Sequence, residues 1–142
     1  QTVDDLVEDF LFLKELDPEM VGIGPFIAHK DTPFCNERSG TLDDTLFYLA
    51  LLRLMLPNVL LPATTALGTI HPRGREMGVL SGANVVMPNL SPVSVRKKYM
   101  LYDGKICTGD EAAECRMCLS RRMERIGCEV VTDRGDYKKR LA

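Results

Sequence analysis

Hydrophobic residues recur with helical spacing at the start of the chain. The positions that repeat near a 3.6-residue period predict a helix with one apolar face, formed by Val3, Leu6, Val7, Phe10, Leu13 and Leu16. Thr2 is suited to cap this helix, and Asp4 and Asp5 place carboxylates in its first turn, where the helix dipole favours negative charge. Asp17 precedes a proline, so we expect the helix to end there.

The same start signal occurs a second time. TVDD at residues 2–5 is matched by TLDD at residues 41–44, which predicts a second helix that ends at Pro57. A third, weaker helix is predicted over residues 73–81, with Gly82 as its stop. Short apolar runs separate these helices and are predicted to be buried strands, at residues 21–27, 59–66 and 84–89.

The order of these elements predicts an α/β fold. Strands that are joined through helices run parallel, with right-handed crossovers. Three strands cannot close a barrel, and a complete (β/α)8 barrel needs about 250 residues, whereas this chain has 142 and begins at Gln1 rather than Met. We therefore expect the C-terminal half of a TIM-type barrel with parallel strands, a partial barrel that is completed by a missing N-terminal half-barrel or by a second copy of itself.

The chain is predicted to divide at residue 106. Residues 1–106 would form the partial barrel, and residues 107–142 a cysteine-containing extension with a charged helix over about residues 111–126, closed by Gly127. The 18 basic and 20 acidic residues give a net charge of −2, so neither a nucleic acid nor an anionic membrane is an expected partner. With no apolar run of about 18 residues, we expect a cytoplasmic protein that acts on a small molecule.

Polar residues follow each predicted strand, where parallel α/β folds place their reactive groups. Thr64 and Thr65 could donate hydrogen bonds to a carboxylate, or could simply form a capped turn. Arg73 and Arg75 could bind a carboxylate, although a solvated first helical turn is the simpler interpretation. His29 and His71 are isolated and are interpreted as loop histidines.

Three of the five cysteines form a pattern near the C-terminus. Cys107, Cys115 and Cys118 are spaced C-x7-C-x2-C, and the last two share one face of the predicted helix. Three thiolates suit an iron–sulfur cluster, whose usual complement is four, and zinc is the competing metal. Three unrelated reduced thiols are the alternative. Cys35 and Cys128 are interpreted as small core residues.

Four segments, taken together and in order, resemble a known family. VGIGPFI followed by DTPF, LPATTALGTI followed by GRE, GANVVMPN, and LYDGKIC with its two later cysteines are similar to the C-terminal half of the HydE-type radical SAM maturases of [FeFe]-hydrogenase. This half-barrel is related to biotin synthase and carries the BATS domain (the biotin- and thiamin-synthesis-associated domain). The resemblance covers essentially the whole chain.

The resemblance implies a parent enzyme that uses S-adenosylmethionine and a [4Fe-4S] cluster for adenosyl-radical attack on a sulfur-containing substrate. The CxxxCxxC motif that holds that cluster is absent here, so this chain should be inactive alone. By family likeness, the adenosyl group would be approached by Gly24, Pro25, Phe26 and Ile27. The substrate pocket would be lined by Thr64, Thr65, Met87, Tyr99 and Tyr102. An auxiliary iron–sulfur cluster, absent in some members, would be held by Cys107, Cys115 and Cys118.

Two other functions remain open at this point. The first is a methylornithine-synthase-like or biotin-synthase-like radical SAM enzyme, which offers no reason for the three cysteines. The second is a stand-alone metal- or cluster-binding module that docks on a partner protein.

Overall fold

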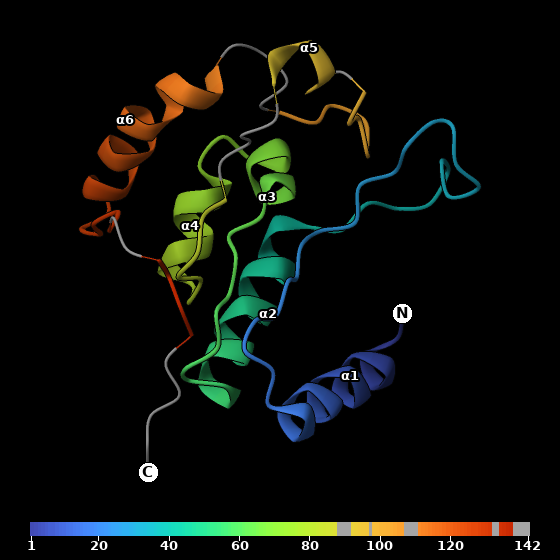
Figure 1. Cartoon of the computed structure of the whole chain (residues 1–142). Coiled ribbons are helices and arrows are strands. Elements are labelled where there is room, and N and C mark those ends of the chain that lie inside the picture. Colours follow the sequence, from blue (N-terminus) through green and yellow to red (C-terminus); the bar gives the residue numbers. More distant parts are fainter. Residues whose placement is uncertain (88–91, 97, 107–110, 132–133, 138–142) are drawn as a thin grey trace.

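The computed structural model describes residues 1–87, 92–96, 98–106, 111–131 and 134–137. Within these ranges it has six helices (Figure 1), and α1 and α6 lie on opposite sides of the central helix α2. A loop over residues 28–40 projects from the body beside α2 and carries short turns but no helix. No helix in the described part is long and apolar enough to cross a lipid bilayer.

Helix α1 (Val3–Leu16) begins as the sequence predicts. The Thr2 hydroxyl accepts a hydrogen bond from the Asp5 amide at 3.2 Å, and the Asp5 carboxylate accepts one from the Thr2 amide at 2.6 Å. This reciprocal pair satisfies two amides that a helix start leaves without partners. The predicted apolar face is only partly buried, however, because Phe10 is its one buried member while Val3, Val7 and Leu16 are exposed.

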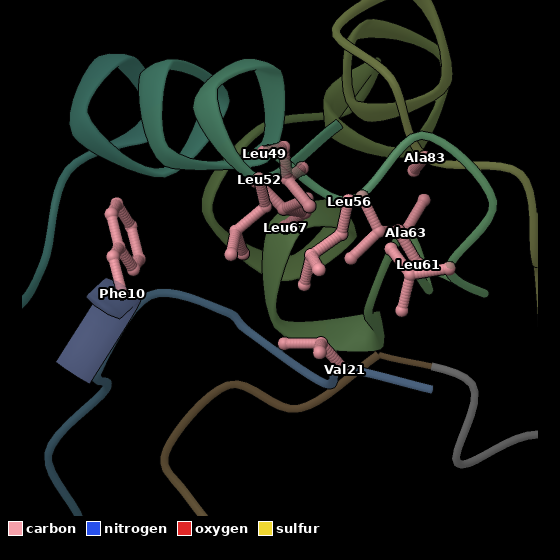
Figure 2. Close-up of a cluster of buried hydrophobic side chains, with 10 residues drawn as sticks. Phe10, Val21, Leu49, Leu52, Leu56, Leu61, Ala63, Leu67 and Ala83 are labelled. Carbon is pink, nitrogen blue, oxygen red and sulfur yellow. The ribbon is translucent and has the colours of Figure 1, made fainter. Parts of the chain in front are cut away.

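Helix α2 (Leu42–Met55) supplies the centre of the hydrophobic core. The Thr41 hydroxyl caps it by accepting a hydrogen bond from the Asp44 amide at 3.1 Å, which confirms the second start signal. Figure 2 shows its inner face meeting side chains from the other elements. The core cluster consists of Phe10, Val21, Leu49, Leu52, Leu56, Val59, Leu61, Ala63, Leu67 and Ala83.

Helices α3 (Thr65–Ile70) and α4 (Gly74–Leu80) follow one another and pack together, and α4 also contacts α2. The predicted third helix is thereby confirmed as α4. The prediction of a strand over residues 59–66 runs too far, because α3 begins at Thr65. Thr64 forms the corner between the extended segment and this helix.

The predicted parallel direction is seen, but the predicted strands are not. In the described residues, the three apolar runs make two isolated parallel bridges, Met20 with Leu60 and Pro62 with Val85. The Leu60 amide donates to the Glu19 carbonyl, and the Leu60 carbonyl accepts from Val21. Two residues further along the second segment, Pro62 is the next residue whose amide would face the first segment. Proline has no amide hydrogen, so the hydrogen bonds between these two segments stop after one bridge.

The described extended segments therefore run parallel to one another without forming a regular sheet. Between the second and third extended segments, the Leu61 amide donates to the Asn84 side-chain oxygen at 2.8 Å. A side-chain oxygen therefore takes the place of a backbone carbonyl there. A partial barrel with complete strands is not seen in the described residues.

The C-terminal region lies against the outside of this body. It contains α5 (Val93–Arg96) and α6 (Glu111–Glu124), which was predicted as the charged helix. Gly127 follows α6 with φ 75°, and the amide of Cys128 donates to the Met123 carbonyl at 3.0 Å. This left-handed glycine ends the helix as the sequence predicts.

Candidate functional site at the ends of the extended segments

The closest approach between two predicted site residues joins Gly24 to Thr64. A Cβ atom placed on Gly24 would lie 2.7 Å from the Thr64 hydroxyl oxygen, so only glycine allows the two segments to meet this closely. The Met20–Leu60 bridge and the Gly24–Thr64 contact have the same sequence offset of 40 residues. The first two segments therefore run side by side in parallel up to their carboxyl ends.

The Thr64 hydroxyl is the unsatisfied polar group at this contact. Its oxygen is buried and has no hydrogen-bond partner among the described residues. Thr64 is also the N-cap residue of α3, yet its side chain makes no capping bond. This differs from Thr2 and Thr41, whose hydroxyls cap their helices. The alternative interpretation, a capped turn before the next helix, is therefore right about the position of Thr64 but not about its hydroxyl.

The residues after Gly24 combine buried and exposed surfaces. Pro25 is buried, Phe26 is exposed and Ile27 is partly exposed. The ring of Phe26 meets Phe34 edge-on with centroids 6.5 Å apart. The Phe26 carbonyl accepts a hydrogen bond from the Gly40 amide at 2.9 Å, which closes the base of the projecting loop.

The segment that carries Tyr99 and Tyr102 is fixed next to these same strand ends. The Asp103 amide donates to the Ala28 carbonyl at 3.2 Å, and the Ile106 amide donates to the Thr69 hydroxyl at 3.4 Å. Residues 99–106 therefore connect the loop after the first extended segment to α3, which follows the second.

Sequence reasoning missed a lysine between the two predicted tyrosines. The Lys105 ammonium lies 5.7 Å from the Tyr99 ring centroid and 5.9 Å from that of Tyr102, within the range of cation–π attraction. It also donates to the Tyr99 carbonyl at 2.8 Å. In the sequence, Lys105 follows Tyr102 by three residues and Tyr99 by six. A three-residue spacing predicts a contact in a helix, but neither spacing predicts one in an irregular segment.

The other candidate residues have mixed outcomes. Met87 is 55% exposed at the end of the third extended segment, and no described contact joins it to Thr64. Thr65 is the first residue of α3 and is partly exposed. His29 and His71 each accept a backbone amide hydrogen on Nδ1, at 3.1 and 3.2 Å, as expected of loop histidines.

Two interpretations are corrected by burial. Arg75 was interpreted as part of a solvated helical turn, but it is 6% exposed, because its side chain lies against Gly68 of α3. Arg73 is exposed, as that interpretation requires. Cys35 was interpreted as a core residue, but it is exposed in the projecting loop. Cys128 is half-buried.

The predicted metal site falls largely outside the described residues. Cys107 lies there, as does the side chain of Cys115, while Cys118 is exposed on α6. Helix α6 includes both positions 115 and 118, so they are one turn apart on one face. Among the described residues, no group of three or more histidine, cysteine or acidic side chains could hold a metal ion.

A partly buried ion pair joins α6 to α4 and was also missed. Arg122 donates to both carboxylate oxygens of Glu76, at 2.6 Å each. Burial would raise the pKa of Glu76, but the hydrogen bonds and charge of Arg122, aided by Arg73, outweigh it and hold this pKa below its ordinary value.

Comparison with known proteins gives one informative match. No protein-family model matches the chain. The chain is similar to the [FeFe] hydrogenase maturase subunit HydE of Thermotoga maritima, with 50% identity over 139 residues. The alignment covers 98% of this chain but 40% of that relative, in its C-terminal part. The resemblance predicted from the sequence motifs is thereby confirmed.

Proposed function

We propose that this chain forms the C-terminal part of a HydE-type radical SAM enzyme, an [FeFe]-hydrogenase maturase that acts by adenosyl-radical chemistry on a sulfur-containing substrate. The observation that carries the proposal is the 50% identity over nearly the whole chain. Because the chain spans 40% of that relative, the activity would belong to the longer protein. Among the 142 residues, the five cysteines include no CxxxCxxC spacing, so the radical-generating cluster would be held elsewhere.

The residues at the end of the first extended segment would bind the adenosyl group. Gly24 and Phe26 are both exposed there, so the Gly24 backbone and the Phe26 ring are open to a flat ligand. S-adenosylmethionine, when bound to the [4Fe-4S] cluster of the longer protein, would supply the adenosyl radical. The role of Gly24, Pro25, Phe26 and Ile27 in this chain would be to bind and orient the nucleoside.

The second strand end would hold the substrate. The buried, unpartnered hydroxyl of Thr64 can donate a hydrogen bond to a carboxylate or other anion, and Thr65 offers a second hydroxyl beside it. Leaving such a group without a partner costs free energy, which a ligand would restore. Met87, Tyr99 and Tyr102 would complete the pocket, with Lys105 holding the two tyrosines together.

The three cysteines would hold the auxiliary iron–sulfur cluster of the family. The support is their spacing and the helix that includes positions 115 and 118. Zinc is the competing metal, and a colourless zinc protein after anaerobic reconstitution with iron and sulfide would overturn the cluster assignment.

The missing part of the barrel would cover the free edge of the first extended segment. A groove of about 490 Å³ lies between α1 and this segment, and its apolar lining includes Phe12, Leu16 and Met20, all of them exposed. An N-terminal half-barrel would bury these residues, and a second copy of the chain is the alternative. Light scattering on the isolated 142 residues distinguishes a monomer from such a dimer.

The proposal is tested in a cell that lacks its own HydE-type maturase. The whole polypeptide that carries these residues should restore hydrogenase activity and form 5′-deoxyadenosine from S-adenosylmethionine. Thr64→Val should reduce the restored activity, whereas Thr2→Val, the same chemical change on α1, should not. Failure of the unaltered protein to restore activity while it is folded and soluble would overturn the function.

A further inference from the structure

Over residues 117–124, the part of α6 whose side chains are described, Met123 is buried and Leu119 is half-buried. Among the residues of α6 whose side chains are described, Met123 is the buried hydrophobic one, and it is not part of the core cluster. Met117 and Cys118 are exposed. The apolar surface buried over these described residues is small, so we look to polar contacts for the attachment of this part of the helix.

The strongest described contact of α6 is polar and bidentate. Arg122 donates from Nε and Nη2 to the two carboxylate oxygens of Glu76, at 2.6 Å each, and Nη2 also donates to the Pro72 carbonyl at 2.8 Å. The Glu76 side chain is 9% exposed and that of Arg122 is 34% exposed. A planar guanidinium matched to a buried carboxylate fixes orientation as well as position.

We infer that the Glu76–Arg122 pair is the attachment point that positions the cysteine-bearing helix α6 on α4. These two residues are positioning residues, because they act on the cysteines only through the helix. The inference goes beyond the proposed function and does not require that the cysteines bind a cluster.

The Glu76–Arg122 pair lies outside the core cluster, so the attachment of α6 can be weakened without a change in the core. Glu76 is on α4, which contacts α2 and α3, but the carboxylate points to α6 and not into the cluster around Leu49 and Leu52. Breaking the pair removes contacts of α6 and leaves every member of the core cluster in place.

The test uses amide hydrogen exchange in the whole polypeptide that carries these residues. Arg122→Ala should speed exchange in α6 by about tenfold or more, the loss expected for a charge-assisted bidentate contact, with α2 unchanged. Arg122→Lys, which keeps the charge but loses the planar fork, should fall between. Arg121→Ala, one residue away and exposed, is the matched control and should leave α6 as it is.

Two outcomes would overturn the inference. If Arg122→Ala and Arg121→Ala change α6 equally, the pair is not the attachment. If Arg122→Ala speeds exchange in α2 as much as in α6, the pair supports the whole fold instead. A Glu76→Gln variant distinguishes the roles independently, because it keeps the shape of the side chain and should release α6 alone.

Discussion

The body of the molecule and its C-terminal region are held together by different forces. In the body, the core cluster draws residues from α1, α2, α3 and all three extended segments. In the described part of the C-terminal region, the buried hydrophobic residue is Met123. Contacts with the body include directional hydrogen bonds to Ala28, Thr69, Pro72 and Glu76, beside the packing of the Ile106 side chain against Gly68. Burial is tolerant of small shifts, whereas directional bonds depend on geometry and ionisation.

Because of this contrast, we expect the two regions to be sensitive to different substitutions and conditions. The body should respond to loss of apolar volume and to close steric contact. The C-terminal region should respond to loss of single polar atoms and to pH.

The largest effect is expected from a cavity in the body. Leu52→Ala removes a side chain that is 0% exposed, so it should lower the free energy of unfolding by about 2–5 kcal/mol, measured by urea denaturation. Leu54→Ala on the same helix, at a position 79% exposed, is the control and should change little. Equal effects at the two positions would contradict the assignment of the core.

A second effect concerns the strand ends. Gly24→Ala would place a Cβ atom 2.7 Å from the Thr64 hydroxyl oxygen, and should cost about 1–3 kcal/mol through overpacking. Thr64→Ala removes the obstructing atoms, so the double variant should recover most of the loss in thermal denaturation. Without that recovery, the segments do not meet at Gly24.

The attachment of the C-terminal region at Glu76 should weaken in acid. The folded-state pKa of Glu76 lies below its ordinary value of 4.5, so the pair with Arg122 contributes fully above that value and is lost as pH falls through the lower, folded-state pKa. The ratio of α6 exchange rates between Arg122→Ala and the unaltered protein should therefore fall from about tenfold at neutral pH toward one in acid.

Using this ratio at each pH cancels the intrinsic pH dependence of amide exchange. Other charges near Glu76 include Arg73. A ratio that is constant with pH would show that another contact holds α6.

The smallest effect distinguishes two threonines within the body. Thr41→Ala removes a hydroxyl that caps α2, and should lower the free energy of unfolding by about 1 kcal/mol. Thr64→Val removes a hydroxyl that makes no capping bond, so chemical denaturation should show no loss, because its buried oxygen has no partner to lose. A loss at Thr64 equal to that at Thr41 would mean that its hydroxyl serves the fold.

Local chemistry in the sequence predicts helices α1, α2, α4 and α6, but it missed the short helices α3 and α5. The TVDD and TLDD signals depend on atoms within one turn, and both helices begin where these signals occur. The parallel direction of the extended segments also follows from the order of elements. The order of elements does not predict that the segments pair at single bridges only. That outcome depends on which neighbouring segment the missing amide of Pro62 would have faced.

The parts that sequence reasoning missed are the long-range polar contacts. Glu76 and Arg122 are 46 residues apart, and no local pattern indicates that two charged residues on different helices will meet. The burial of Arg75 has the same origin, since it depends on how α4 packs against Gly68 of α3. The likeness to HydE supplied the candidate binding residues, but contacts such as that of Lys105 become visible only in three dimensions.

The hydrogen bond between the Gly40 amide and the Phe26 carbonyl has a consequence for how this protein can change over evolution. It ties together the two ends of the projecting loop, so the residues between them can be lengthened, shortened or replaced while the chain leaves and rejoins the body at the same places. Doubling such a loop costs only about 0.6 kcal/mol in closure entropy. The length and sequence of this loop can therefore change at little risk to the rest of the architecture.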